Sequence, residues 1–153
     1  MKKIFTVAII GFFLLSTAFA AFGAANGTPA EAEALVKKAI AYTKQVGKAK
    51  AMAEFSNTKG KFIDRDLYVF VYDTKGTVLA HGQNPKMVGK NLFEVKDPDG
   101  KQYVKERIEL VKAKGKGWQE YKFSNPLTKK IEAKKAYIEK YEDMIFGCGA
   151  YPK

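Results

Sequence analysis

The sequence has one cysteine, one histidine and one tryptophan among its 153 residues, and these shortages exclude several classes of protein. Cys148 has no partner for a disulfide within the chain, so a disulfide-stapled scaffold is excluded. Zinc fingers and haem attachment motifs need more ligands than Cys148 and His81 supply. A catalytic triad would have to use His81, and no Gly-x-Ser-x-Gly motif accompanies it. The sequence therefore predicts a protein that is not an enzyme and holds no cofactor and no metal.

Acidic residues are also scarce relative to basic ones, with 16 Asp and Glu against 27 Lys and Arg. The formal net charge of +11 would suit nucleic acid, anionic lipid or an acidic ligand. The two acids of the stretch 97–100, Asp-Pro-Asp-Gly, fit no calcium loop, and this sequence is typical of a turn.

The N-terminus indicates export. Lys2 and Lys3 precede an apolar run at 4–22, which contains a small-residue Ala-x-Ala site at 18–20. We expect residues 1–25 to be a signal peptide and residues 26–153 to be one domain, periplasmic or secreted after cleavage. The alternative is an uncleaved membrane anchor, because the apolar run is nearly long enough to span a bilayer. An exported protein does not normally meet nucleic acid, and no RNA-binding signature is present, so no nucleic-acid partner is predicted.

The hydrophobic pattern begins with a long helix. Thr28, Pro29 and Glu31 form a helix start with a capping box, and apolar residues recur at helical spacing up to Phe55. Gly47 interrupts this pattern as either a weak point or a close-packing point.

Beyond this helix the period changes to two, which is typical of strands. Residues 67–72 and 77–81 predict a hairpin, and both faces of its first strand are apolar, so both should be covered. An irregular crossover leads to a second helix at 101–114 and then to strands at 118–123, 131–141 and 144–151. The order predicts an α+β fold in which the long N-terminal helix packs on a five-stranded antiparallel sheet with a helical crossover.

Lys134 is the most unusual residue of the predicted strands. It shares a face with Ala136 and Ile138, and a buried ammonium is costly unless an anion offsets it. Lys134 is therefore either a cation for a ligand carboxylate or phosphate, or a strand-end lysine whose head reaches water.

Aromatic residues on the preceding strand, 118–123, also have two interpretations, as ligand contacts or as part of the hydrophobic core. Tyr121 and Phe123 share a face with Gln119, where they either wall a small ligand or form plain core. Trp118 belongs to the other face unless a bulge near Gly117 turns it.

His81 and Cys148 have simpler interpretations. A lone histidine at a strand end is more often structural than a ligand contact, and Cys148 is expected to behave as a small apolar residue. The glycines beside Cys148 predict that something packs closely against this last strand.

Several short motifs occur in a characteristic order. They are Tyr-Val-Phe-Val-Tyr-Asp at 68–73, Gly-Thr-Val-Leu-Ala-His at 76–81, Asn84-Pro85, Val-Gly-Lys-Asn-Leu at 88–92, the turn at 97–100, the stretch 115–121, Lys134 with Tyr137, and 147–151. This ordered set, covering roughly residues 30 to 151, resembles the single Cache domains. These are PAS-like extracytoplasmic sensor modules of bacterial chemotaxis receptors and sensor kinases.

The resemblance implies a ligand site between the sheet and its crossover, for small organic acids, amino acids or related metabolites. The family's site would map onto Tyr68, Phe70, His81, Trp118, Tyr121 and Lys134. The sequence departs from the family's pattern at two positions that bear on which ligand binds. His81 is followed by Gly82 rather than proline, and Phe123 stands where a tryptophan is common.

Two function hypotheses remain open. The first is a periplasmic sensing module for a small carboxylate or amino-acid-like ligand that acts in signal transduction, such as chemotaxis. Because the sequence stops at Lys153 without a signalling domain, we expect it to act through a membrane receptor, kinase or transporter. The second is a structural or protein-interaction subunit with no exchangeable ligand. In either case a homodimer through the long N-terminal helix is open.

Overall fold

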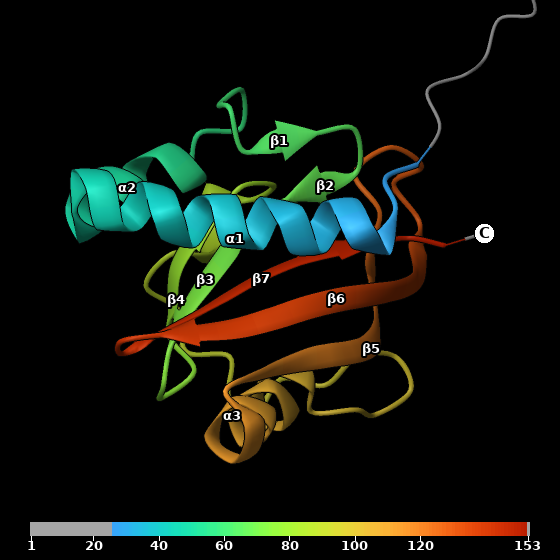
Figure 1. The fold of residues 1–153 in the computed structure, drawn as a ribbon. Helices are drawn as coiled ribbons and strands as arrows, with labels where there is room; N and C mark the ends of the chain where they lie inside the picture. The colour runs from blue at the N-terminus through green and yellow to red at the C-terminus, as the bar shows by residue number, and fades with distance from the viewer. Residues whose placement is uncertain (1–25, 153) are drawn as a thin grey trace, which may run out of the picture.

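The computed structural model describes residues 26–152, and the predicted leader at 1–25 lies outside the described residues. The predicted α+β fold is confirmed (Figure 1), but the strand expected at 67–72 is divided at Val69, and its first part pairs with a short strand at 63–64 that was not predicted. The helices are α1 (Pro29–Val46), α2 (Lys48–Phe55) and α3 (Tyr103–Lys114), with a short 3-10 helix η1 (Pro85–Met87). The strands are β1 (Ile63–Asp64), β2 (Leu67–Tyr68), β3 (Phe70–Asp73), β4 (Val78–His81), β5 (Lys116–Ser124), β6 (Ile131–Tyr141) and β7 (Met144–Ala150).

The leading helix starts as the sequence predicts. The Thr28 hydroxyl accepts the N–H of Glu31 at 3.2 Å, and the Glu31 carboxylate accepts the N–H of Thr28 at 2.7 Å. The single helix expected up to Phe55 is instead divided into α1 and α2 at Gly47, whose φ is 84°. A side chain at Gly47 would meet nothing within 4 Å, so this glycine is the weak point of the pattern rather than a close contact.

The five-stranded antiparallel sheet has the order β4-β3-β7-β6-β5, and β1 pairs with β2 in a separate hairpin. The last strand, β7, therefore lies at the centre, between β3 and β6. In Figure 1, α1 lies across one face of this sheet over β6 and β7, whereas α3 lies on the opposite side, beside β5. The structure thus has three layers, and the residues onto which the resemblance maps a ligand site lie on the α3 side, except for Trp118.

Each face of the sheet has its own hydrophobic core. The α1 side is built around residues such as Val36, Phe55 and Phe146, and the α3 side around residues such as Phe70, Ile108 and Ile138. All residues of 67–72 are buried, which confirms that this stretch is covered on both faces.

Two glycines of β7 allow large side chains to lie flat on the sheet. A Cβ on Gly147 would lie 2.1 Å from Cε2 of Phe70, and one on Gly149 would lie 2.7 Å from Cε of Lys134. The expected close packing against this strand is confirmed. Cys148 lies between the two glycines in the core on the α1 side, fully buried as a small apolar residue.

The turn at 97–100 is also as predicted. One oxygen of Asp97 accepts the N–H groups of Asp99 and Lys101, and the other accepts the N–H of Lys122 on β5. The Asp97 carboxylate therefore closes the turn and fastens the crossover to the edge of the sheet.

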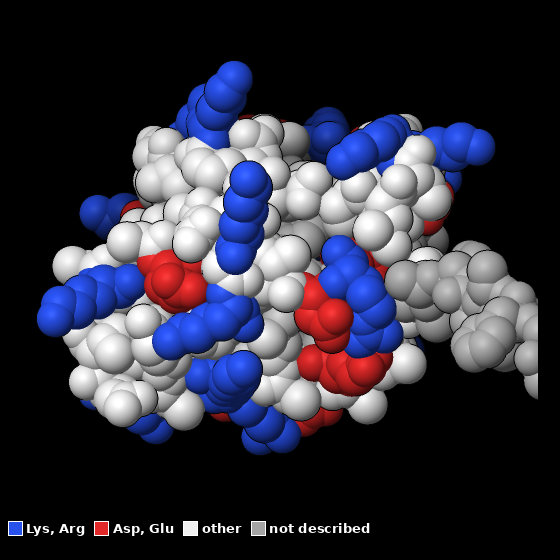
Figure 2. Space-filling view, turned by 90° about the horizontal axis from the view of Figure 1, so that it is seen from above, with Lys and Arg blue, Asp and Glu red and all other residues white. Residues whose placement is uncertain are grey.

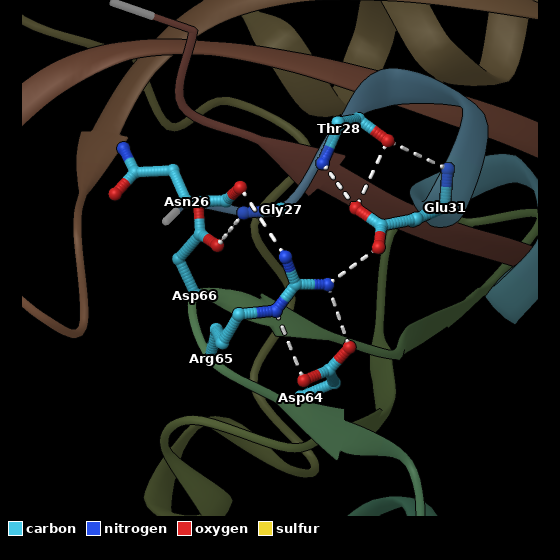
Figure 3. A network of polar contacts seen from close by, with 7 residues as sticks. All are labelled: Asn26, Gly27, Thr28, Glu31, Asp64, Arg65 and Asp66. Carbon is cyan, nitrogen blue, oxygen red and sulfur yellow. Dashed lines mark hydrogen bonds and ion pairs between the residues drawn. The ribbon is translucent and has the colours of Figure 1, made fainter. Parts of the chain in front are cut away.

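A polar network joins the start of α1 to the β1–β2 hairpin (Figure 3). The Arg65 guanidinium bonds Glu31 at 2.7 Å, Asp64 at 2.8 Å and the carbonyl of Asn26 at 3.3 Å. The buried Asp66 accepts the N–H of Gly27 at 2.5 Å.

The end of β7 belongs to the same network. The other oxygen of Asp66 accepts the N–H of Tyr151 at 3.3 Å, and the Asn26 side chain donates to the Tyr151 carbonyl at 3.0 Å. Both ends of the described chain are thus held by one carboxylate.

Among residues 26–152, no helix has the length and apolar character needed to cross a membrane.

Replacing Asp66 by alanine should lower the free energy of unfolding by about 1–3 kcal/mol, because the N–H groups of Gly27 and Tyr151 lose their acceptor. Asp64→Ala is the matched control, since its exposed carboxylate pairs with Arg65 at the surface and should contribute less than about 1 kcal/mol. Urea denaturation of both variants measures the difference. Equal losses would contradict the role given to Asp66.

Replacing Gly147 by alanine should lower the free energy of unfolding by about 1–3 kcal/mol, because its Cβ overlaps the Phe70 ring. In a Phe70→Leu background the same change should be milder, by about 0.5 kcal/mol or more, because the smaller side chain leaves room. A double-mutant cycle by chemical denaturation tests this coupling. Strictly additive effects would show that the ring is not what makes glycine necessary.

Candidate functional site

The candidate site is a group of buried polar side chains among aromatic rings on the α3 side of the sheet. Lys134 reaches it from β6, His81 from the end of β4, and Arg107 from α3. All three side chains are buried, at 1–2% exposure. The site is therefore closed in this structure.

Lys134 lies flat across β7 and ends in a cage of rings. Its stem crosses Gly149, and the Nζ atom lies 3.9 Å from the ring centroid of Tyr68. Three further rings surround this ammonium at 5.1–5.6 Å, those of Tyr151, Phe70 and Phe123. Ring faces attract a cation, so they offset part of the cost of removing this ammonium from water.

The Lys134 ammonium has no hydrogen-bond partner among the described residues. Burial, with a smaller contribution from the charge of Arg107, lowers the pKa of Lys134 to about 7. The parity that placed Lys134 on a core-facing side is therefore confirmed, and the alternative that its head reaches water is wrong.

Arg107 is a second buried cation in the same layer. Its guanidinium carbon lies 4.6 Å from the ring centroid of Phe70 and 4.8 Å from that of Tyr72, with Tyr121 and Tyr103 at 5.3 and 5.4 Å. Its Nε atom donates to the Gln119 side chain at 3.3 Å, but its Nη2 atom has no partner among the described residues.

Sequence reasoning missed Arg107, although its position carries a signal. It stands at i+4 from Tyr103 and i−4 from Val111, on the buried stripe of the predicted helix. A charged residue on the apolar stripe of a helix indicates a buried charge, in the same way as the inward face of Lys134 does on its strand.

His81 is a neutral hydrogen-bonding group here. Its ring lies near the rings of Tyr68, Phe70 and Phe123, at centroid distances of 5.1–6.5 Å. The Nδ1 atom accepts the N–H of Asn84 at 3.0 Å, which leaves the proton of the neutral ring on Nε2. Burial, with the charges of Lys134 and Arg107, lowers the pKa of His81 to about 3.

The structure brings together five of the six site residues predicted from the sequence. Tyr68 and Phe70 form part of the cage around Lys134, His81 lies beside them, and Tyr121 is the cross-strand neighbour of Lys134. The Tyr68 hydroxyl, close to that of Tyr151, makes no hydrogen bond of standard geometry.

Trp118 is not part of this group. The β5–β6 register runs without a break from Lys116 to Ser124, so no bulge turns Trp118 toward the site. It lies on the opposite face, 38% exposed, with its ring against that of Tyr137.

The site carries positive charge without a compensating acid. Neither Lys134 nor Arg107 forms an ion pair within the described part of the chain, and the buried Asp66 is engaged by the N–H groups of Gly27 and Tyr151. A metal cation would be repelled by such a site, and no cluster of metal-ligating side chains occurs within residues 26–152. The arrangement is suited to an anion.

Among known proteins, relatives are found in bacterial sensory systems. The sensor histidine kinase MctS of Rhizobium johnstonii is 33% identical over 89 residues, which are 57% of this chain and 19% of MctS. The methyl-accepting chemotaxis protein McpP of Pseudomonas putida is 29% identical over 90 residues, which are 58% of this chain and 16% of McpP. The chain thus spans less than a fifth of the length of each relative.

Solved structures show the same fold. The crystal structure of a methyl-accepting chemotaxis protein from Vibrio parahaemolyticus has a TM-score of 0.70 at 25% identity, covering 80% of this chain and 86% of that one. A Cache chemosensory domain described for carboxylic acid recognition has a TM-score of 0.69 at 24% identity, covering 81% and 92%.

The model of the family "Single Cache domain 2" matches residues 17–153, which is nearly the whole chain. The resemblance read from the ordered motifs is therefore confirmed. By this match, and by a fold shared with chemoreceptor sensor domains, the chain belongs to the single Cache domain 2 family, the sensory modules that lie outside the cytoplasm in chemotaxis receptors and sensor kinases.

Proposed function

We propose that this domain binds a small carboxylic acid outside the cytoplasm, with a carboxylate of the ligand at Lys134. The observation that carries the proposal is the Lys134 ammonium, which is 1% exposed and lacks a hydrogen-bond partner among the described residues. A buried cation of this kind is costly, and an anion bound against it repays that cost. The Cache domain described for carboxylic acid recognition supports the same chemistry.

Two neutral donors complete the proposed site. The Nε2–H of His81 and the hydroxyl of Tyr68 are buried near the Lys134 cage. A carboxylate has two oxygens that accept several hydrogen bonds, so the ammonium and these donors can bind one carboxylate together.

We infer that the ligand is bound rather than transformed. The imidazole of His81 has no Ser or Cys nucleophile hydrogen-bonded to it among residues 26–152, because the nearby Ser56 hydroxyl accepts the backbone N–H of His81 at 3.4 Å and Cys148 lies on the other face of the sheet. The low pKa of His81, about 3, also makes it a poor base at neutral pH. The bound state would then be passed to a membrane receptor, kinase or transporter, as in the sensory systems of the relatives.

Replacing Lys134 by methionine should weaken acetate or propionate binding by about 1.5–3 kcal/mol, because a charge-assisted hydrogen bond is lost. The unliganded variant should melt no lower than the unsubstituted protein, since an unpaired buried cation has been removed. Lys135→Met is the matched control, because that side chain points to the other face, near Trp118 and Glu120.

Titration calorimetry and thermal melting measure both effects. Acid at ~100 times its dissociation constant should stabilise the unsubstituted protein by ~2.7 kcal/mol. The proposal fails if no carboxylic acid shifts the melting temperature, or if the two lysine variants bind equally well.

Acid binding should depend on pH through Lys134. The pKa of this amine is about 7 in the free protein, and a bound carboxylate raises it by favouring the ammonium. Binding therefore takes up a proton above pH 7, and affinity should fall by up to about tenfold per pH unit there. Below pH 6 it should level off, because Lys134 is already protonated.

Calorimetry between pH 5.5 and 9, in buffers with different ionisation enthalpies, measures this proton uptake. His81 does not contribute, because its pKa of about 3 keeps it neutral throughout the range. An affinity independent of pH would exclude Lys134 as the carboxylate-binding cation.

Two observations favour the second candidate, a protein-interaction subunit. The site is closed by its own side chains, and the face formed by α1, α2 and the β1–β2 hairpin carries many basic side chains (Figure 2). Exposed basic residues of α1 include Lys37, Lys38 and Lys44. This candidate predicts a partner whose binding weakens steeply with salt, and no thermal shift with any acid.

A further inference from the structure

A single carboxylate at Lys134 leaves Arg107 unexplained. Arg107 is 1% exposed, and an arginine stays protonated at any ordinary pH. It forms no ion pair among the described residues, and its one side-chain hydrogen bond of standard geometry joins Nε to Gln119. The domain therefore buries a second positive charge that the proposed function does not use.

The packing around Arg107 offsets only part of this cost. The rings of Phe70, Tyr72, Tyr103 and Tyr121 attract the guanidinium, but the Nη2 atom remains without an acceptor. Burying a polar N–H without a partner opposes folding. A planar guanidinium with unused N–H groups is the group best suited to bind a carboxylate through two parallel hydrogen bonds.

The two cations lie beside the same aromatic ring. Both contact the Phe70 ring, with Lys134 Nζ at 5.4 Å and the Arg107 guanidinium carbon at 4.6 Å from its centroid. Their separation therefore cannot exceed the sum of these distances. Tyr121 lies beside both cations. It is the cross-strand partner of Lys134, and its ring centroid lies 5.3 Å from the guanidinium carbon of Arg107.

We infer that the site selects a small dicarboxylate, with one carboxylate at Lys134 and the other at Arg107. This inference rests on the proposed function and names the class of acid. A monocarboxylate leaves one buried positive charge without an anion, whereas a dicarboxylate neutralises both. His81 is neutral and cannot serve as a third charge in this balance.

The alternative is that Arg107 only fills space, held by the four rings and Gln119. In that case its charge would not affect which acid binds, and a second carboxylate on the ligand would bring no gain. The two interpretations therefore differ in how the protein ranks acids of similar size and different charge.

The test compares succinate with monomethyl succinate, which keeps nearly the same length but carries one charge, and with propionate. Calorimetry on the unsubstituted chain should give succinate an affinity at least about tenfold above that of monomethyl succinate, because the second charge-assisted contact is lost. Equal affinities for the two would overturn the inference. If none of the three acids binds, the proposed function itself fails.

Arg107→Met then tests the residue. It should reduce the preference for succinate over monomethyl succinate to about twofold or less, because the second charge-assisted contact is no longer available. Arg107→Lys should retain part of the preference, because a point charge remains without the fork of donors. A preference unchanged in Arg107→Met would overturn the inference. Circular dichroism and thermal melting show whether each variant is folded. If Arg107→Met does not fold, the affinities of the unsubstituted chain for succinate and monomethyl succinate still test the preference for a dicarboxylate.

Discussion

The layer between the sheet and α3 contains two positive charges that have been removed from water without an acid beside them, and much of the local structure follows from that constraint. The faces of aromatic rings offset part of the cost of burying these charges, and both cations lie over the Phe70 ring. Ring faces are weaker partners than water or a carboxylate, so burial still lowers the pKa of Lys134 to about 7. The cost is concentrated at one place in an otherwise ordinary hydrophobic core.

The same constraint explains the composition of β7. Phe70 and Lys134 can lie flat on the sheet only because Gly147 and Gly149 have no side chains, and these glycines alternate with buried Cys148 on the other face. Tyr151 follows directly and contacts the ammonium with its ring, while its backbone is bonded by Asp66 and Asn26. The candidate site and both ends of the described domain therefore meet at Tyr151.

Much of this architecture follows from local patterns in the chain. The capping box at Thr28, the hairpin that ends at His81 and the inward direction of Lys134 each depend on periodicity or spacing, which neighbouring residues determine. Gly47 shows the limit of this reasoning, because helical spacing continues through it while the backbone does not. Arg107 shows another limit, since a basic residue in a helix is normally exposed, and only the layer packed above it makes this one buried.

The sequence by itself determined the fold class, the order of the strands along the chain, the family and the inward direction of Lys134. These depend on hydrophobic period and on ordered motifs, both of which are local properties. Only the tertiary structure decided that β7 lies at the centre of the sheet, that Trp118 faces away from the site, and that Arg107 and Lys134 share the ring of Phe70. Those are relations between segments far apart in the chain, and they are fixed by strand register and by how the layers pack, which no local pattern specifies.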